Sequence, residues 1–248
     1  YSAAVNHIPT DAIYPVSTGG VIDPATGYLN MYKGMVETND DHYVLSSTKS
    51  TETATEAGDF IVFDLFVKIT EASDIYLTSA SSVVSATNKG LQNAARVAFV
   101  YQGNGDSSST AGTVQAYKAS ADSPVYIWEP NAEAHTGAAI KHASDTYGIQ
   151  DAGTKANIPY SGVIAEFTKD ADVVLNSTDE GKFKPMTGLI YTPSTNNSYT
   201  KYFSLAEGIT KFRVYIWVEG QDVDCENDAS GSQVSYNIQL SMDDGSGA

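Results

Sequence analysis

The stretch that decides the fold is Lys211-Phe-Arg-Val-Tyr-Ile-Trp-Val-Glu219. Four apolar side chains occupy every second position of this stretch: Phe212, Val214, Ile216 and Val218. The positions between them form the opposite face: Lys211, Arg213, Tyr215, Trp217 and Glu219. A period of two is the pattern of a β-strand that turns one face towards a core. The sequence therefore predicts a strand over residues 211–219.

An acidic loop (residues 220–228) follows this strand directly. It carries Asp222, Asp224, Glu226 and Asp228 with no basic residue among them. Carboxylates this close repel one another unless water, a cation or a partner's lysines neutralise them. Alternating carboxylates also begin calcium-binding loops, so one prediction is a calcium site at these four residues. The loop lacks the glycine and distal glutamate of an EF-hand, and a merely solvated acidic loop is an equally weighted alternative.

Further strands are predicted on both sides of this stretch. Residues 60–69 alternate with one apolar and one partly apolar face, and residues 234–242 alternate with one polar face. Shorter candidates are residues 74–77, 95–101, 125–128, 163–167, 173–175 and 189–191. The core is expected to include the inward residues of the three long strands: Ile61, Phe63, Leu65, Val67, Phe212, Val214, Ile216, Val234, Ile238 and Leu240.

Long connections rich in small and polar residues separate these strands, at residues 102–122, 131–160 and 176–202. Residues 138–144 could form one or two helical turns. Helical heptads are absent from the sequence, and strands do not alternate with long helices. The prediction is an all-β fold, an antiparallel β-sandwich of jelly-roll type with long loop insertions. Residues 16–248 would form the single sandwich domain, preceded by an extended N-terminal segment at residues 1–15.

Charge and composition exclude several kinds of partner. The 248 residues include 30 acidic and 14 basic side chains, which gives a net charge of −16. Such a surface repels nucleic-acid phosphates, so no nucleic-acid partner is expected. The sequence has no apolar run long enough to cross a bilayer, so no membrane span is expected. A start at Tyr1 followed by small residues suits a mature secreted chain, which predicts an extracellular or cell-surface location.

Catalytic motifs are not found in the sequence. The histidines, at positions 7, 42, 135 and 142, form no H-E-x-x-H motif, and there is no G-x-S-x-G elbow. The single thiol, Cys225, has no histidine nearby in sequence and is expected to be buried. The neighbouring Glu133 and His135 are more typical of a solvated surface than of an active site. The protein is therefore predicted not to be an enzyme.

Aromatic residues offer a different kind of site. The chain holds 16 tyrosines and two tryptophans. Tyr215 and Trp217 fall on the charged face of their strand, and Tyr126 and Trp128 share a face of theirs. Such rows could stack on sugar rings, pack in a subunit interface or form a second core layer.

Four segments carry a resemblance to a known group of proteins. Residues 211–242, with the loop Trp-Val-Glu-Gly-Gln-Asp-Val-Asp-Cys225, resemble the end of secreted β-sandwich proteins of the TasA and camelysin class. Upstream, residues 63–68, 96–99 and 128–131 are similar to core-strand segments of the same group. The resemblance covers about half of the chain and implies a jelly-roll fold and assembly into extracellular biofilm fibres, in which one subunit lends a strand to the next. The chain departs from the group in its three long insertions, and no catalytic metal motif supports the protease activity ascribed to camelysin.

These observations favour a structural subunit of an extracellular filament or biofilm-matrix fibre. Its partner would be a second copy of the chain, and residues 1–15, bounded by Pro9 and Pro15, would be the donor strand that completes an open sheet edge. An ordinary first strand of its own domain is the simpler alternative for this segment. The alternative function is a non-catalytic binding module, or a virion surface protein, with a carbohydrate-binding sandwich.

Overall fold

The computed structural model describes residues 2–7, 13–39, 42–52, 59–87, 89–132, 134–147, 173–175, 182, 187–194, 199–226 and 229–245. The protein is predominantly β, with 47% strand and 7% helix, and contains several antiparallel sheets. The predicted all-β class is confirmed, while the jelly-roll arrangement stays a prediction. The strand predicted at residues 163–167 lies outside the described ranges. Among the described helices, none is both long and apolar enough to cross a membrane.

The strands in these ranges follow one another along almost the whole chain. They are β1 (Ser2–His7), β2 (Ile22–Asp23), β3 (Tyr28–Leu29), β4 (Met31–Asn39), β5 (His42–Ser50), β6 (Phe60–Ile69), β7 (Ser73–Leu77), β8 (Ser82–Ser85), β9 (Ala95–Gly105), β10 (Val125–Glu129), β11 (Val173–Leu175), β12 (Ile190–Tyr191), β13 (Thr200–Leu205), β14 (Gly208–Val218), β15 (Val234–Asn237) and β16 (Leu240–Ser241). Two helices accompany them, α1 (Ala111–Gln115) and α2 (Gly137–Tyr147).

A six-stranded sheet in the order β1-β6-β14-β9-β10-β12 forms the centre of the fold. The strand predicted at residues 211–219 is β14, which pairs antiparallel with β6 on one side and with β9 on the other. Phe212 lies opposite Leu65 of β6, and Val214 lies opposite Phe99 of β9. The predicted bounds of β6 agree with those observed.

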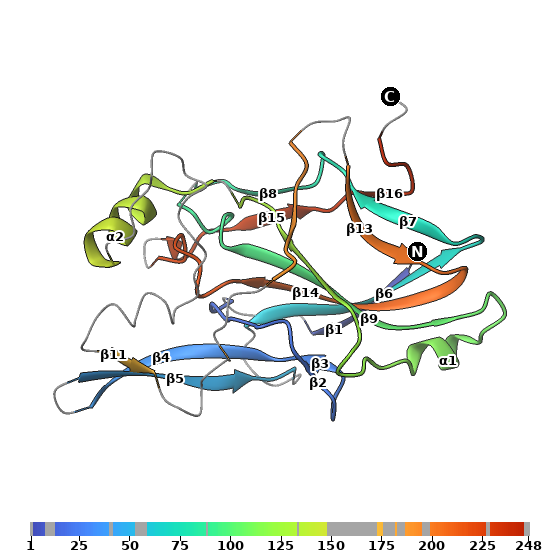
Figure 1. The fold of residues 1–248 in the computed structure, drawn as a ribbon, viewed down its shortest axis with the longest axis horizontal. Coiled ribbons are helices and arrows are strands. Elements are labelled where there is room, and N and C mark those ends of the chain that lie inside the picture. The colour runs from blue at the N-terminus through green and yellow to red at the C-terminus, as the bar shows by residue number, and fades with distance from the viewer. Residues whose placement is uncertain are drawn as a thin grey trace.

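One face of the central sheet packs on a first core. The sheets β13-β7-β16 and β15-β8 cover this face, and Figure 1 shows them on one side of β14, β6 and β9. The predicted core residues Phe212, Val214 and Ile216 are buried here. The other seven pack against them half-buried, namely Ile61, Phe63, Leu65, Val67, Val234, Ile238 and Leu240. The predicted core is therefore confirmed.

The opposite face packs on a second core. Tyr215 and Trp217 of β14 are fully buried there, together with Val62 of β6. Residues from the chain before and within β2 to β4 cover them, namely Val16, Ile22, Leu29 and Met31. The second-core interpretation of Tyr215 and Trp217 is thus confirmed, and neither side chain is available to stack on a sugar. Both faces of the central strand are apolar because both are covered.

The last predicted strand, residues 234–242, is divided in two. β15 pairs with β8, and β16 pairs with β7. Between them Gln239 accepts a hydrogen bond from the N–H of Thr78 (3.0 Å) and donates its own N–H to Oγ of Ser81 (2.9 Å). The strand is interrupted because its partner turns between β7 and β8.

A long hairpin of β4 and β5 projects below the central sheet in Figure 1 and was not predicted. Its register runs from Met31 opposite Ser50 to Asn39 opposite His42. The predicted strand at residues 173–175 is β11, and it pairs parallel with β5. This hairpin and β11 form a separate three-stranded sheet.

The N-terminal strand β1 occupies the edge of the central sheet. It runs antiparallel to β6, with Ser2 opposite Phe66 and Val5 opposite Phe63. Residues 8–12 lie outside the described ranges. The chain is followed again from Ile13, and Val16 then donates its N–H to the carbonyl of Val218 (3.0 Å). In this structure residues 2–7 therefore complete the sheet of their own chain.

Candidate functional site

The acidic loop turns inward after β14. Asp222 and Asp224 are buried, at 7% and 1% exposure. The carbonyl oxygen of Asp222 accepts a hydrogen bond from the N–H of Cys225 (2.9 Å). The side-chain Oδ1 of Asp222 accepts another from the N–H of Asp224 (2.9 Å). Gly90, at a φ of +99°, lies so close that a Cβ there would be 2.9 Å from Oδ1 of Asp224. The turn therefore buries Asp222 and Asp224, two of the four predicted metal ligands.

Arg96 neutralises part of this charge from within the protein. Its fully buried Nη2 donates to Oε1 of Glu129 and to Oδ2 of Asp222, both at 2.6 Å. Its Nη1 donates to the carbonyls of Asn93 (2.8 Å) and Ala95 (2.9 Å). Arg96 stands at the start of β9 and Glu129 at the end of the adjacent, antiparallel β10. The pairing of β9 with β10 thus places Arg96 and Glu129 next to each other beside the acidic loop.

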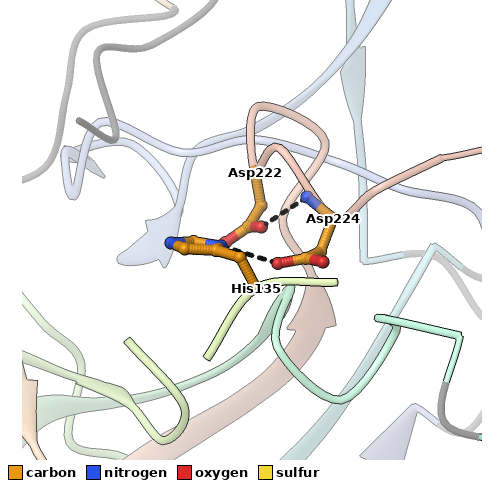
Figure 2. Close-up of side chains that lie close together, drawn as sticks. All are labelled: His135, Asp222 and Asp224. Atoms are coloured by element: carbon orange, nitrogen blue, oxygen red, sulfur yellow. Dashed lines mark hydrogen bonds and ion pairs between the residues drawn. The ribbon is translucent and has the colours of Figure 1, made fainter. Parts of the chain in front are cut away.

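His135 approaches the same loop from the segment that precedes α2. Its Nδ1 lies 2.7 Å from Oδ2 of Asp224, and the N–H of Thr136 donates to Oδ1 of Asp224 (2.8 Å). Figure 2 shows the imidazole facing the two carboxylates of Asp222 and Asp224. The His135 side chain is only 9% exposed. These contacts fix the start of α2 to the acidic loop.

His135, Asp222 and Asp224 together form a candidate metal centre. One ligand atom from each residue lies within 4.8 Å of the other two. Imidazole nitrogen and carboxylate oxygen are ordinary ligands of divalent metals in proteins. This buried group could hold a metal ion, and the sequence predicted two of its three members.

The four residues of the predicted calcium site do not all meet. Glu226 turns to the surface, where its Oε1 lies 2.8 Å from Nδ1 of His142 on α2. Asp228 lies outside the described residues. The structure therefore joins Asp222 and Asp224 to a histidine and leaves Glu226 in a separate pair.

The electrostatics of the site follow from burial and from these pairs. Burial raises the pKa of Glu129, although the guanidinium of Arg96 acts in the opposite direction. The hydrogen bond with Asp224 raises the pKa of His135. Burial also raises the pKa of Glu219, whose carboxylate accepts hydrogen bonds from Nε1 of Trp217 (3.0 Å) and the N–H of Gln221 (3.1 Å). Burial thus disfavours the charged forms of Glu129 and Glu219, and at Glu129 the cationic groups of Arg96 and His135 oppose this effect.

Arg96, Glu129 and His135 were not identified as residues of this site from the sequence. The prediction of a solvated His135 is wrong, because that side chain is nearly enclosed by the contacts described above; Glu133 lies outside the described ranges. Arg96 carried a signal, since it interrupts the apolar run at residues 95–101. A charged side chain inside a buried strand requires a buried partner of opposite charge.

Comparison of the chain with protein-family models, with curated proteins and with solved structures found no match. The resemblance to the TasA and camelysin class therefore stays an expectation from sequence patterns, and the site has to be interpreted from its own geometry.

Cys225 is expected to react slowly with iodoacetamide in the folded protein at about pH 8. The residue is half-buried rather than fully buried as predicted. This partial burial, together with the negative charges of Asp222 and Glu219, raises the pKa of its thiol to about 12, so little thiolate is present. Mass spectrometry of native and urea-unfolded samples over time measures the difference. Equal rates in the two samples would contradict this description of the loop.

Proposed function

We propose that this protein is a structural subunit of an extracellular filament and that it assembles by exchange of its N-terminal strand. The observation that supports the proposal is the place of β1, which lies at the edge of the central sheet and, among the described strands, pairs with β6 alone. A second copy of the chain presents the same β6 edge. The N-terminal strand of one copy can therefore complete the sheet of the next copy with the same register.

Main-chain pairing suits the charge of this protein. At a net charge of −16, like subunits repel one another. Association must then be driven by backbone hydrogen bonds and apolar burial, and salt is expected to promote it. A β6 edge without β1 would expose a row of unpaired N–H and C=O groups, which favours capture of another strand. The jelly-roll arrangement and secretion that the sequence resemblance implies belong to the same proposal.

Removing residues 1–12 is expected to leave a folded monomer that no longer forms filaments. The β6 edge stays available in this variant, but no copy has a strand to donate. Negative-stain microscopy and light scattering of the full-length and truncated proteins measure assembly, and circular dichroism checks the β fold.

A synthetic peptide of residues 1–12 provides the matched control. Added to the truncated protein, it should raise the melting temperature by filling the β6 edge without restoring filaments, since the peptide is not joined to a second domain. Filaments of unchanged form from the truncated protein would end the strand-exchange proposal. Dispersed monomers from the full-length protein would favour the binding-module alternative.

The carbohydrate-binding alternative has less support. Its expected stacking residues Tyr215, Trp217 and Trp128 are all fully buried. Tyr126 is half-buried and packs against Phe203, at 5.5 Å between ring centroids. No observation on these four aromatic residues favours a sugar site.

Calcium binding at the acidic loop is a more specific proposal than the binding of an unspecified metal ion. Calcium typically takes about six to eight oxygen ligands. Both carboxylate oxygens of Asp222 already accept hydrogen bonds, one from Arg96 and one from the N–H of Asp224. A calcium site would therefore need Glu226, Asp228 or a neighbouring subunit to supply the remaining oxygens.

A further inference from the structure

We propose that His135, Asp222 and Asp224 bind a divalent first-row transition metal of the zinc class, and that this ion attaches the start of α2 to the acidic loop. The inference is independent of filament assembly, because it concerns residues far in sequence from the N-terminal strand. It rests on the kind, number and support of the ligand atoms.

The kind of ligand separates zinc from calcium. Zinc and its neighbours in the first row bind imidazole nitrogen together with carboxylate oxygen, whereas calcium selects oxygen alone. Here the ring of His135 contacts Asp224 directly, with Nδ1 2.7 Å from Oδ2. A hard-oxygen site would not be expected to turn a histidine towards its carboxylates.

The number of ligand atoms also favours a metal of the zinc class. Three side chains offer atoms that lie within 4.8 Å of one another. Ligand atoms around a tetrahedral zinc ion are roughly 3.4 Å apart, as bond lengths of about 2.0–2.2 Å require. Small side-chain movements would therefore complete three bonds and leave a fourth position for water. Metal binding requires a ring nitrogen with a free lone pair, so any proton on the ligating nitrogen of His135 would leave to solvent as the ion binds.

Neighbouring groups already orient the two carboxylates. Arg96 holds Oδ2 of Asp222, and the N–H of Thr136 holds Oδ1 of Asp224. Such outer contacts are typical of metal sites, where they set the direction of each ligand. Two more buried carboxylates, Glu129 and Glu219, lie close by, and Arg96 is the cation that these buried groups share. A divalent ion would reduce the excess of negative charge.

Binding would join two distant parts of the chain. His135 and Asp224 are 89 positions apart in sequence. His135 precedes the first residue of α2 by two positions, and Asp224 follows β14 by six residues. The ion would therefore stabilise the contact between the helical segment and the end of the central sheet.

The test compares metals by thermal unfolding of the full chain after treatment with EDTA. Zinc chloride or cobalt chloride at about a hundredfold excess over its Kd should raise the melting temperature by roughly 5–10 °C. Calcium chloride at the same concentration should produce no comparable shift. Cobalt provides a second readout, because a low-coordinate nitrogen and oxygen site gives it visible absorption bands that zinc then removes.

Two histidine variants make the assignment specific. His135→Ala should lose both the zinc-induced shift and the cobalt bands, whatever its basal stability. His142→Ala should retain both, since that residue pairs with Glu226 at the surface. The proposal is overturned if zinc stabilises His135→Ala as much as the parent, if His142→Ala alone loses the effect, or if only calcium stabilises the parent.

Discussion

Replacing Arg96 with methionine is expected to lower the free energy of unfolding by about 3–5 kcal/mol. The guanidinium is fully buried and contacts both Glu129 and Asp222 at 2.6 Å. Methionine fills similar space but leaves two buried carboxylates without their cation. Urea unfolding followed by circular dichroism, with EDTA present, measures the loss without a contribution from bound metal.

An exposed ion pair provides the matched control for Arg96. Nζ of Lys201 lies 2.8 Å from Oδ1 of Asp74, with both side chains about half exposed. Lys201→Met should leave the unfolding midpoint unchanged within error, because solvent screens such pairs. If Arg96→Met is as stable as Lys201→Met, the buried network contributes little to folding.

Replacing Trp217 with alanine is also expected to cost about 3–5 kcal/mol. The indole is fully buried in the second core, so the substitution removes apolar contact and leaves a cavity. It also removes the N–H that donates to Oε2 of Glu219 at 3.0 Å, a carboxylate with 0% exposure. Both losses act in the same direction.

Val84→Ala serves as the control for this second substitution, since Val84 is 57% exposed. Its unfolding midpoint should match that of the parent in the same urea titration. Trp217→Phe should fall between the two, because it preserves most of the apolar volume and loses only the donor. A Trp217→Ala protein with the parent's midpoint would contradict the burial of this face.

The long strands of the central sheet were predictable because their period of two is sustained. β6 has the bounds that the pattern indicates, and β14 differs only at its ends. The charged side of β14 was harder to interpret. Arg213 on that side is buried, and its Nη1 donates to Oδ1 of Asp64 (2.9 Å) while its Nε donates to Oε2 of Glu52 (2.9 Å). Alternation reveals which residues share a face, but it does not tell whether a charged face meets water or a buried ion pair.

The β4–β5 hairpin was missed for a physical reason. Its described side chains between Tyr32 and Lys49 are half-buried or exposed on both faces. Burial on one face is what selects apolar residues at every second position. Where neither face is buried, the hairpin is held by hydrogen bonds between the backbones of its two strands. These bonds do not require particular side chains, so the sequence shows no alternation.

The candidate metal centre could be predicted only in part. Asp222 and Asp224 stand out because they are close together in sequence. Arg96 and His135 join them through the order of β14, β9 and β10 and through a long connection, and that arrangement depends on tertiary packing. The charge repulsion that seemed to require an external cation is partly relieved by the protein's own arginine.

The edge position of β1 has a kinetic consequence for assembly. Because residues 2–7 pair with β6 of their own chain, a monomer has no open edge at that side of the central sheet. Exchange between copies would then replace one set of main-chain pairs with an equivalent set, so it gains no additional hydrogen bonds. The effective concentration of the tethered strand sets the protein concentration that exchange must exceed. Growth by strand exchange should accordingly show a lag and a threshold protein concentration.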